Sequence, residues 1–175
     1  MPHFPTEPGK EKLENIRRTE RNNRDPGASH APQKQYLNFR LNVAWYALSV
    51  DRLVEVLPLP KITRVPNVSD HVLGVMNFRG EVLSAIDLKQ LFGLPKLTLE
   101  SDATIIVVEH DKVRTGLLVD GVGELVSLSQ DDLTEEPVLA EKSQPTFFEG
   151  AAHWGDILVS IIRLEGFWWL PVELQ

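Results

Sequence analysis

Two stretches of the chain repeat one another, and this repeat constrains the fold more than any other feature. Residues 46–59 read YALSVDRLVEVLPL, and residues 115–128 read TGLLVDGVGELVSL. At an offset of 69, five of the fourteen positions are identical, among them Asp51 with Asp120 and Glu55 with Glu124. A period near seventy residues is too long for a solenoid repeat and suits two small folded units.

A second pair of similar segments follows in the same order, at an offset of 76. Residues 74–88 read GVMNFRGEVLSAIDL, and residues 150–164 read GAAHWGDILVSIIRL. The identical pairs are Gly74/Gly150, Ser84/Ser160, Ile86/Ile162 and Leu88/Leu164, and Phe78 stands opposite Trp154. We therefore predict a duplicated unit. Each copy has about 60–70 residues, which is marginal for an independent fold, so the two copies are expected to share an apolar seam beside a groove.

Short apolar runs, many of them β-branched, dominate the chain from Tyr36 onward. Residues 37–45 alternate between apolar and mostly polar side chains, which is the period of a strand. The later runs are residues 53–57, 72–78, 81–86, 103–109, 113–119, 124–128 and 156–162. Turn-forming residues separate these runs, as at Pro66-Asn67 and Arg79-Gly80. With the duplication, this pattern predicts an all-β fold of two small barrels.

Few helices are expected. One short helix is predicted at residues 88–92, because Asp87 can cap its start and Gly93 can close its end. A further helical turn is predicted at Asp131-Asp132, and Asn42 is expected in a hairpin turn.

The first 35 residues differ from the rest of the chain. They contain five prolines, seven Lys or Arg and five Asp or Glu, a net charge of +2, whereas the remainder carries −9. We predict a disordered extension over residues 1–35 and one folded domain over residues 36–175. The cluster Arg17, Arg18, Arg21 and Arg24 either touches an anionic partner or is simply solvated. An acidic folded part argues against nucleic acid as its partner.

The sequence offers no catalytic or metal-binding constellation that we would defend. There is no cysteine, which fits a cytoplasmic protein, and no apolar run reaches the roughly 20 residues that span a bilayer. His71, His110 and His153 are isolated and lack a second ligand at metal spacing. Asp51 and Asp120 occupy equivalent places in the repeat, so we expect each to cap a turn rather than to act as an acid or base. The Gly121-Val122-Gly123 segment is expected to be a turn. We expect no enzyme activity and no cofactor.

The segment VLGVMNFRGEVLSAIDL, residues 72–88, carries most weight for function. Asn77-Phe78-Arg79-Gly80 interrupts two apolar strands, and Gly80 can adopt a positive φ there. Phe78 is expected to face the core and Arg79 to point outward beside apolar surface, as a protein-contact anchor or a solvated turn residue.

GVMNFRGEVLSAIDL resembles the GV-x-N-L-R-G-x-(V/I)-x-P-(V/I)-x-D-L signature of CheW-like domains, and the resemblance covers most of residues 36–165. It implies two five-stranded, SH3-like β-barrels with one or two short helices. It also implies a non-catalytic adaptor of a chemosensory array, which couples the cytoplasmic tip of a chemoreceptor to the regulatory domain of a CheA-type histidine kinase. Adaptors of twitching or gliding systems share this fold and remain an alternative. A small-molecule sensor is a further alternative from another class.

Carried over by position, the resemblance implies a set of partner-binding residues. They are Leu53, Glu55, Gly74, Asn77, Arg79, Ile105, Gly116, Val122 and Leu125. Core packing remains an alternative role for Val122 and Leu125, and a solvated strand position for Glu55. The chain departs from the signature at Phe78, which replaces Leu, and at Ser84, which replaces Pro. Near the C-terminus, Trp168 and Trp169 are expected either to plug the seam or to face a partner.

Overall fold

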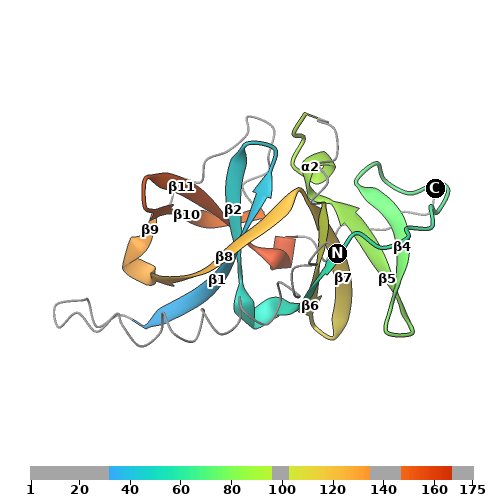
Figure 1. Cartoon of the computed structure of the whole chain (residues 1–175), viewed down its shortest axis with the longest axis horizontal. Coiled ribbons are helices and arrows are strands. Elements are labelled where there is room, and N and C mark those ends of the chain that lie inside the picture. The colour runs from blue at the N-terminus through green and yellow to red at the C-terminus, as the bar shows by residue number, and fades with distance from the viewer. Residues whose placement is uncertain (1–31, 96–102, 135–146, 167–175) are drawn as a thin grey trace, which may run out of the picture. The chain divides into compact units, whose positions relative to one another are not determined.

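A computed structural model describes residues 32–95, 103–134 and 147–166, and these residues form two antiparallel-rich sheets (Figure 1). The strands are β1 (Gln33–Leu41), β2 (Ala44–Ser49), β3 (Leu53–Pro58), β4 (Val72–Phe78), β5 (Glu81–Asp87), β6 (Thr104–His110), β7 (Val113–Val119), β8 (Gly121–Ser129), β9 (Leu133–Thr134), β10 (Phe148–Trp154) and β11 (Ile157–Ile162). The helical elements are η1 (Val50–Arg52), α2 (Leu88–Leu91), η2 (Gln130–Asp132) and η4 (Leu164–Gly166). The predicted all-β class is confirmed.

Each sheet forms one SH3-like barrel subdomain. In subdomain 1 the strand order is β8-β1-β2-β11-β10-β9, and in subdomain 2 it is β3-β6-β7-β5-β4. Hairpin pairs are antiparallel, whereas β2 pairs with β11 and β7 pairs with β5 in parallel. The two sheets therefore have the same pattern of pairing, which is what a duplicated unit predicts.

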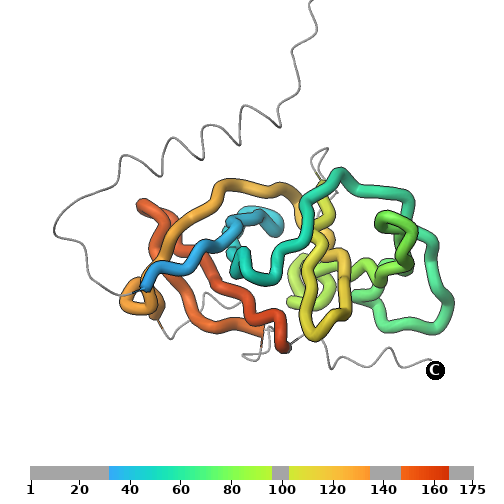
Figure 2. Tube along the Cα trace, turned by 90° about the horizontal axis from the view of Figure 1, so that it is seen from below, coloured from blue at the N-terminus to red at the C-terminus, as the bar shows by residue number. Residues whose placement is uncertain are grey.

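The two sequence repeats do not correspond to the two subdomains. The first repeat holds β1 to β5, and the second holds β6 to β11. Yet β1 and β2 join strands of the second repeat, and β6 and β7 join strands of the first. Figure 2 shows this exchange, because subdomain 1 combines the blue and orange-red strands, which come first and last among the described residues, while subdomain 2 is green and yellow. The expected pair of consecutive folded units is therefore corrected to a contiguous subdomain 2 inserted within subdomain 1.

Equivalent glycines interrupt equivalent strands in the two subdomains. Gly74 lies at a register shift of β4, and Gly150 lies at a register shift of β10. A Cβ at Gly74 would overlap the carbonyl oxygen of Thr63, and a Cβ at Gly150 would overlap that of Thr134. Only glycine permits so close an approach of two backbones. The sequence match between the two glycines thus has a shared steric cause.

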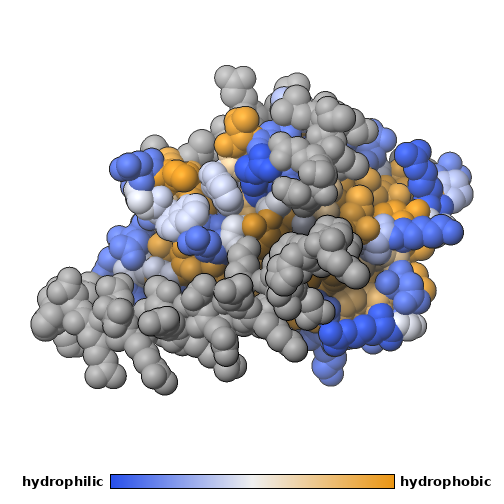
Figure 3. Space-filling view, viewed as in Figure 1, coloured by the Kyte–Doolittle hydropathy of each residue, from blue (hydrophilic) through white to orange (hydrophobic). Residues whose placement is uncertain are grey.

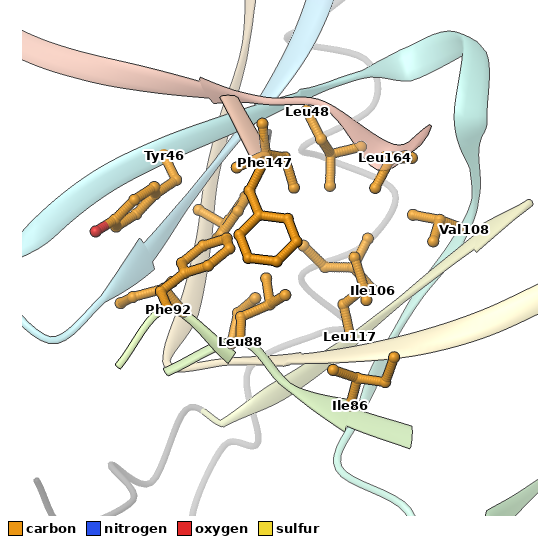
Figure 4. Close-up of a cluster of buried hydrophobic side chains, with 14 of the residues drawn as sticks. Tyr46, Leu48, Ile86, Leu88, Phe92, Ile106, Val108, Leu117, Phe147 and Leu164 are labelled. Atoms are coloured by element: carbon orange, nitrogen blue, oxygen red, sulfur yellow. The ribbon is translucent and has the colours of Figure 1, made fainter. Parts of the chain in front are cut away.

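The largest apolar cluster lies between the sheets and confirms the predicted seam. It contains Phe39, Tyr46 and Leu48 from subdomain 1 together with strand residues of subdomain 2 such as Ile106 and Leu117. Figure 4 shows Tyr46 and Leu48 from one sheet and Ile106 and Leu117 from the other converging on one cluster. The aromatic part of the cluster comprises the rings of Phe39, Tyr46, Phe92, Phe147 and Phe148, in contacts of 5.1 to 6.4 Å between centroids. Each subdomain also has its own smaller interior cluster.

Local predictions for the turns largely hold. Asn42 and Arg79 have positive φ angles of 54° and 52° in their hairpin turns, and Gly80 has one of 85°. Asp87 caps α2 by accepting hydrogen bonds from the backbone N–H groups of Lys89 and Gln90. The predicted turn at Asp131-Asp132 is η2.

Three expectations were wrong in detail. Gly121–Gly123 opens the strand β8 instead of forming a turn, and residues 148–154 form a strand that the list of apolar runs omitted. Strand β1 begins at Gln33, three residues inside the segment predicted to be disordered. The rest of that extension, and Trp168 and Trp169, lie outside the described residues.

The two equivalent aspartates have different roles. The Asp120 carboxylate accepts the backbone N–H of Asn42 at 2.6 Å and so caps the β1–β2 turn, as predicted. For Asp51 the prediction was wrong, because Ser49 is the capping residue and its Oγ accepts the Asp51 N–H at 3.4 Å.

Candidate partner-binding surface

Two of the predicted site residues, Arg79 and Glu55, meet in the structure. Arg79 lies in the turn between β4 and β5, and Glu55 projects from the edge strand β3 of the same subdomain. Their side chains form an ion pair, with 72% and 36% of the two side chains exposed. The guanidinium of Arg79 also lies 5.2 Å from the centroid of the Phe78 ring, whose side chain enters the core as predicted. A charged group held against an aromatic ring and open to solvent is well placed to contact another protein.

The backbone at Arg79 supports a role for its side chain. Arg79 adopts a φ of 52°, a region that L-residues rarely occupy and that glycine occupies freely. The equivalent position in the second repeat is Gly155, with a φ of 59°. Asn77 accepts the backbone N–H of Gly80 at 3.3 Å through Oδ1 and so helps to fix this turn. An arginine therefore occupies a place where the fold itself favours glycine.

The remaining predicted residues divide between the surface and the core. Leu53, Val122 and Leu125 are partly buried and pack against the cluster between the subdomains. Ile105 is fully buried, and Gly116 and Gly74 are buried as well. These three residues expose almost no side-chain surface in the isolated chain, so their role in partner binding stays a prediction. Ile105 packs in the interior of subdomain 2, where a Cβ at Gly116 would lie 3.1 Å from its side chain.

Sequence reasoning missed two exposed apolar patches at equivalent ends of the subdomains. The subdomain 2 patch consists of Val82 and Val113, which are 71% and 52% exposed and are adjacent because β5 and β7 pair in parallel. At the equivalent end of subdomain 1, the exposed apolar residues are Val43, Ile157 and Leu158, which are 90%, 39% and 38% exposed and are called here the subdomain 1 patch. The repeat alignment places an apolar residue at the same position in both repeats, since Val82 aligns with Leu158. The apolar periodicity could not show that these strand ends are exposed to solvent.

A charged rim borders the subdomain 2 patch. Arg114 Nε donates to Glu109 at 2.7 Å, and Arg114 Nη1 donates to Glu81 at 3.0 Å. Together with Val82 and Val113 these side chains line a shallow hollow of about 700 Å³. The space-filling view shows apolar side chains on subdomain 2 framed by charged ones (Figure 3). An apolar centre with a polar rim is the usual composition of a protein–protein interface.

Nothing in the described part of the chain has the composition of a catalytic metal site. Within residues 32–95, 103–134 and 147–166 no group of three or more His, Asp or Glu side chains is placed to hold a metal ion. Over the same ranges, no helix has the length and apolar character needed to cross a bilayer.

Comparison with known proteins identifies the family. The model of the CheW-like domain matches residues 35–168. The chain belongs to the CheW-like domain family.

Relatives with this domain include the chemotaxis protein CheW of Helicobacter pylori, which is 31% identical over 75% of this chain and 79% of its own length. The protein PilI of Pseudomonas aeruginosa is 33% identical over 67% of this chain and 66% of its own length. Among solved structures, the scaffolding protein TtCheW from Thermoanaerobacter tengcongensis superposes with a TM-score of 0.74 at 28% identity. That superposition covers 82% of this chain and 98% of TtCheW.

Proposed function

We propose that the protein is a non-catalytic adaptor of a bacterial chemosensory array, which couples the cytoplasmic tip of a methyl-accepting chemoreceptor to the regulatory domain of a CheA-type histidine kinase. In this role it works in the cytoplasm beside a membrane receptor array and needs no cofactor. Membership in the CheW-like family and similarity to a chemotaxis CheW and to a scaffolding protein support the proposal.

The observation that carries the proposal is the presence of exposed apolar side chains at equivalent ends of the two subdomains. The patches occupy equivalent strand ends, at Val82 and Val113 in subdomain 2 and at Val43, Ile157 and Leu158 in subdomain 1. Exposed apolar surface with a polar rim marks a site of protein association. Exposed apolar residues on both subdomains allow one molecule to hold two partners. An adaptor then biases kinase output through its different affinities for alternative arrangements of its partners.

One observation favours a second candidate. The similarity to PilI, at 33% identity, supports an adaptor of a pilus-dependent twitching or gliding pathway. This candidate uses the same fold and the same surfaces, and it differs in the receptor and the kinase that the adaptor joins.

The test is to measure binding of the purified protein to a CheA-type regulatory domain and to a receptor cytoplasmic fragment by calorimetry. Val82→Asp and Leu158→Asp place a charge in each patch. Burying a valine or leucine contributes about 1.5–3 kcal/mol, so each variant is expected to weaken binding of at least one partner by more than about tenfold. Leu59→Asp, at a residue 38% exposed outside both patches, is the matched control. Unchanged affinity of both patch variants for both partners would refute the proposal.

The Arg79–Glu55 pair is tested separately by charge exchange. Arg79→Glu and Glu55→Arg each place like charges together, and the double variant restores an ion pair with its direction reversed. If Arg79 contacts a partner directly, binding falls about tenfold or more in Arg79→Glu and stays low in the double variant. Full recovery in the double variant would assign the pair an intramolecular role, and wild-type binding in Arg79→Glu would exclude it from the interface.

A further inference from the structure

The chain crosses between the subdomains twice within the described residues, at two equivalent places in the repeat. The first crossing joins β2 to β3 through η1, Val50–Arg52. The second joins β7 to β8 through the single residue Asp120. Asp51 and Asp120 are the equivalent residues of the two crossings. The repeat alignment therefore allows the two places to be compared residue by residue.

The second crossing is fastened by a buried network. Lys89 Nζ, from α2, donates to Asp120 Oδ1 at 2.5 Å, and each side chain is only 3% exposed. The other carboxylate oxygen of Asp120 accepts the Asn42 N–H at 2.6 Å, and the Asp120 N–H donates to the Arg40 carbonyl at 3.0 Å. Asn42 Nδ2 in turn donates to the Pro95 carbonyl at 3.1 Å. The network thus joins the β1–β2 turn of subdomain 1 to α2, which follows the last residue of β5 in subdomain 2.

The first crossing has no fully buried ion pair among the described residues, although Glu165 Oε1 lies 3.9 Å from Nδ1 of His110 at the end of β6. Its aspartate, Asp51, is exposed, and the Asp51 N–H is directed to Ser49 Oγ within the same turn. The position equivalent to Lys89 is Glu165, so the sign of the charge is reversed. Glu165 pairs with Arg52 at 3.3 Å, but the two side chains are 41% and 47% exposed. Pairing of β3 with β6 starts only at Leu53, because η1 takes up the residues before it.

The two ion pairs differ in how firmly they hold the backbone. An exposed pair is screened by water and salt and contributes little. A buried pair holds its elements more firmly, because separating the two side chains leaves an uncompensated charge inside the protein. We propose that Lys89 and Asp120 are a positioning pair, which sets the angle between the two subdomains by fastening one crossing, while the Arg52–Glu165 crossing does not contribute to that angle.

This inference goes beyond the proposed function, since it concerns the isolated protein and holds whichever partners bind. Its consequence for an adaptor is direct. The exposed patches lie on different subdomains, so the angle between the subdomains sets the relative orientation of any two proteins bound to them. The Lys89–Asp120 pair, which touches neither patch, would then set how the two patches are oriented relative to each other.

Spin labels on the two patches measure this angle. The chain has no cysteine, so Val82→Cys and Leu158→Cys introduce the only two labelling sites, at equivalent strand ends. Electron–electron double resonance is recorded on three proteins that carry both labels. The first has no further substitution, the second adds Lys89→Met/Asp120→Asn, and the third adds the matched pair Arg52→Met/Glu165→Gln. Cooperative thermal unfolding checks that each protein is folded. The distance distribution is expected to broaden about twofold or more in the Lys89→Met/Asp120→Asn protein, because interfaces rearrange by steps of a few ångströms, and to stay unchanged in the Arg52→Met/Glu165→Gln protein.

Two results overturn the proposal. One is an unchanged distribution in folded Lys89→Met/Asp120→Asn, and the other is equal broadening in both variants. Amide exchange of the wild-type protein provides an independent test if the Lys89→Met/Asp120→Asn protein does not fold. The amides of Asn42 and Asp120 are expected to exchange at least about tenfold more slowly than that of Asp51, since only stable contacts protect an amide. Equal exchange rates at the three positions would contradict the proposal that the buried network holds the β7–β8 connection in place.

Discussion

Asn38 provides a sharp test of how the interior of subdomain 1 is built. Its side chain is fully buried in β1, and neither Oδ1 nor Nδ2 has a hydrogen-bond partner among residues 32–95, 103–134 and 147–166. The equivalent position in the second repeat, at the offset of 69, is Val107, which is fully buried in the interior cluster of subdomain 2. The fold therefore accepts valine at this place, and we expect Asn38→Val to stabilise the protein.

The magnitude follows from the two amide atoms. Burying a polar group without a partner costs about 1–3 kcal/mol, and the substitution removes that cost while keeping a side chain of similar size. For a chain of 175 residues this predicts a rise in Tm of about 2–12 °C. In urea the unfolding midpoint is expected to rise by about 0.5–1.5 M without a change in slope. The reciprocal variant, Val107→Asn, is expected to destabilise by roughly 2–4 kcal/mol, because it buries an amide in an apolar cluster.

Urea titration followed by circular dichroism measures all three proteins under the same conditions. An unchanged or lowered midpoint for Asn38→Val would refute the reasoning, since it would mean that the amide is satisfied in the folded protein. A destabilising effect of Val107→Asn alone would not support the argument about Asn38, because it is expected of any buried valine.

Two further predictions concern stability. Gly74→Ala is expected to lower the free energy of unfolding by roughly 1–3 kcal/mol or more, because the new Cβ meets the Thr63 carbonyl at a φ of 140°. Gly80→Ala is the control, because φ is also positive there but the space around the new Cβ is open. Equal losses of stability in the two variants would contradict a steric cause at Gly74. Burial lowers the pKa of His71 below its usual range, with the Asp70 carboxylate opposing the change. The unfolded chain then binds a proton first as the pH falls below about 6.5, so this contribution to stability is lost from there down to the folded pKa. His71→Gln is expected to flatten the pH dependence of the urea midpoint between about pH 7 and 5.5, and an unchanged slope would contradict the assignment.

Local physical chemistry allowed much of the fold to be predicted from sequence. The runs at residues 72–78 and 113–119 are strands with those bounds, because apolar residues, several of them β-branched, dominate them and turn residues end them. The turns at Asn42 and Arg79-Gly80 followed from residue type in the same way. Strand β10 was not predicted, because Gly150, Ala151 and Ala152 give it little apolar bulk. Its assignment depends on pairing with β11, which no local pattern contains.

The candidate site was only partly predictable. Arg79 and Glu55 were each chosen by resemblance, but their ion pair joins a turn to an edge strand and needs the tertiary fold. Ile105 was also chosen by resemblance, and its complete burial could not be foreseen because a run of apolar residues in a barrel strand does not reveal which side is covered. The exposed patches at Val82 and Leu158 escaped notice for the same reason. Exposure depends on what packs above a residue, and that is a property of the assembled sheets.

Identity between repeats is a weak guide to role, and the two crossings show why. Asp51 and Asp120 match in sequence and occupy equivalent places, yet one is exposed and the other is 3% exposed. The difference comes from a residue distant in sequence, which is Lys89 at one crossing and Glu165 at the other. A carboxylate can be buried only where a cation and hydrogen-bond donors come with it, so the lysine decides the environment of Asp120. Because subdomain 2 is inserted into subdomain 1 through these two crossings, one lysine-to-glutamate difference gives two equivalent connections different environments, with a buried ion pair at one and an exposed pair at the other.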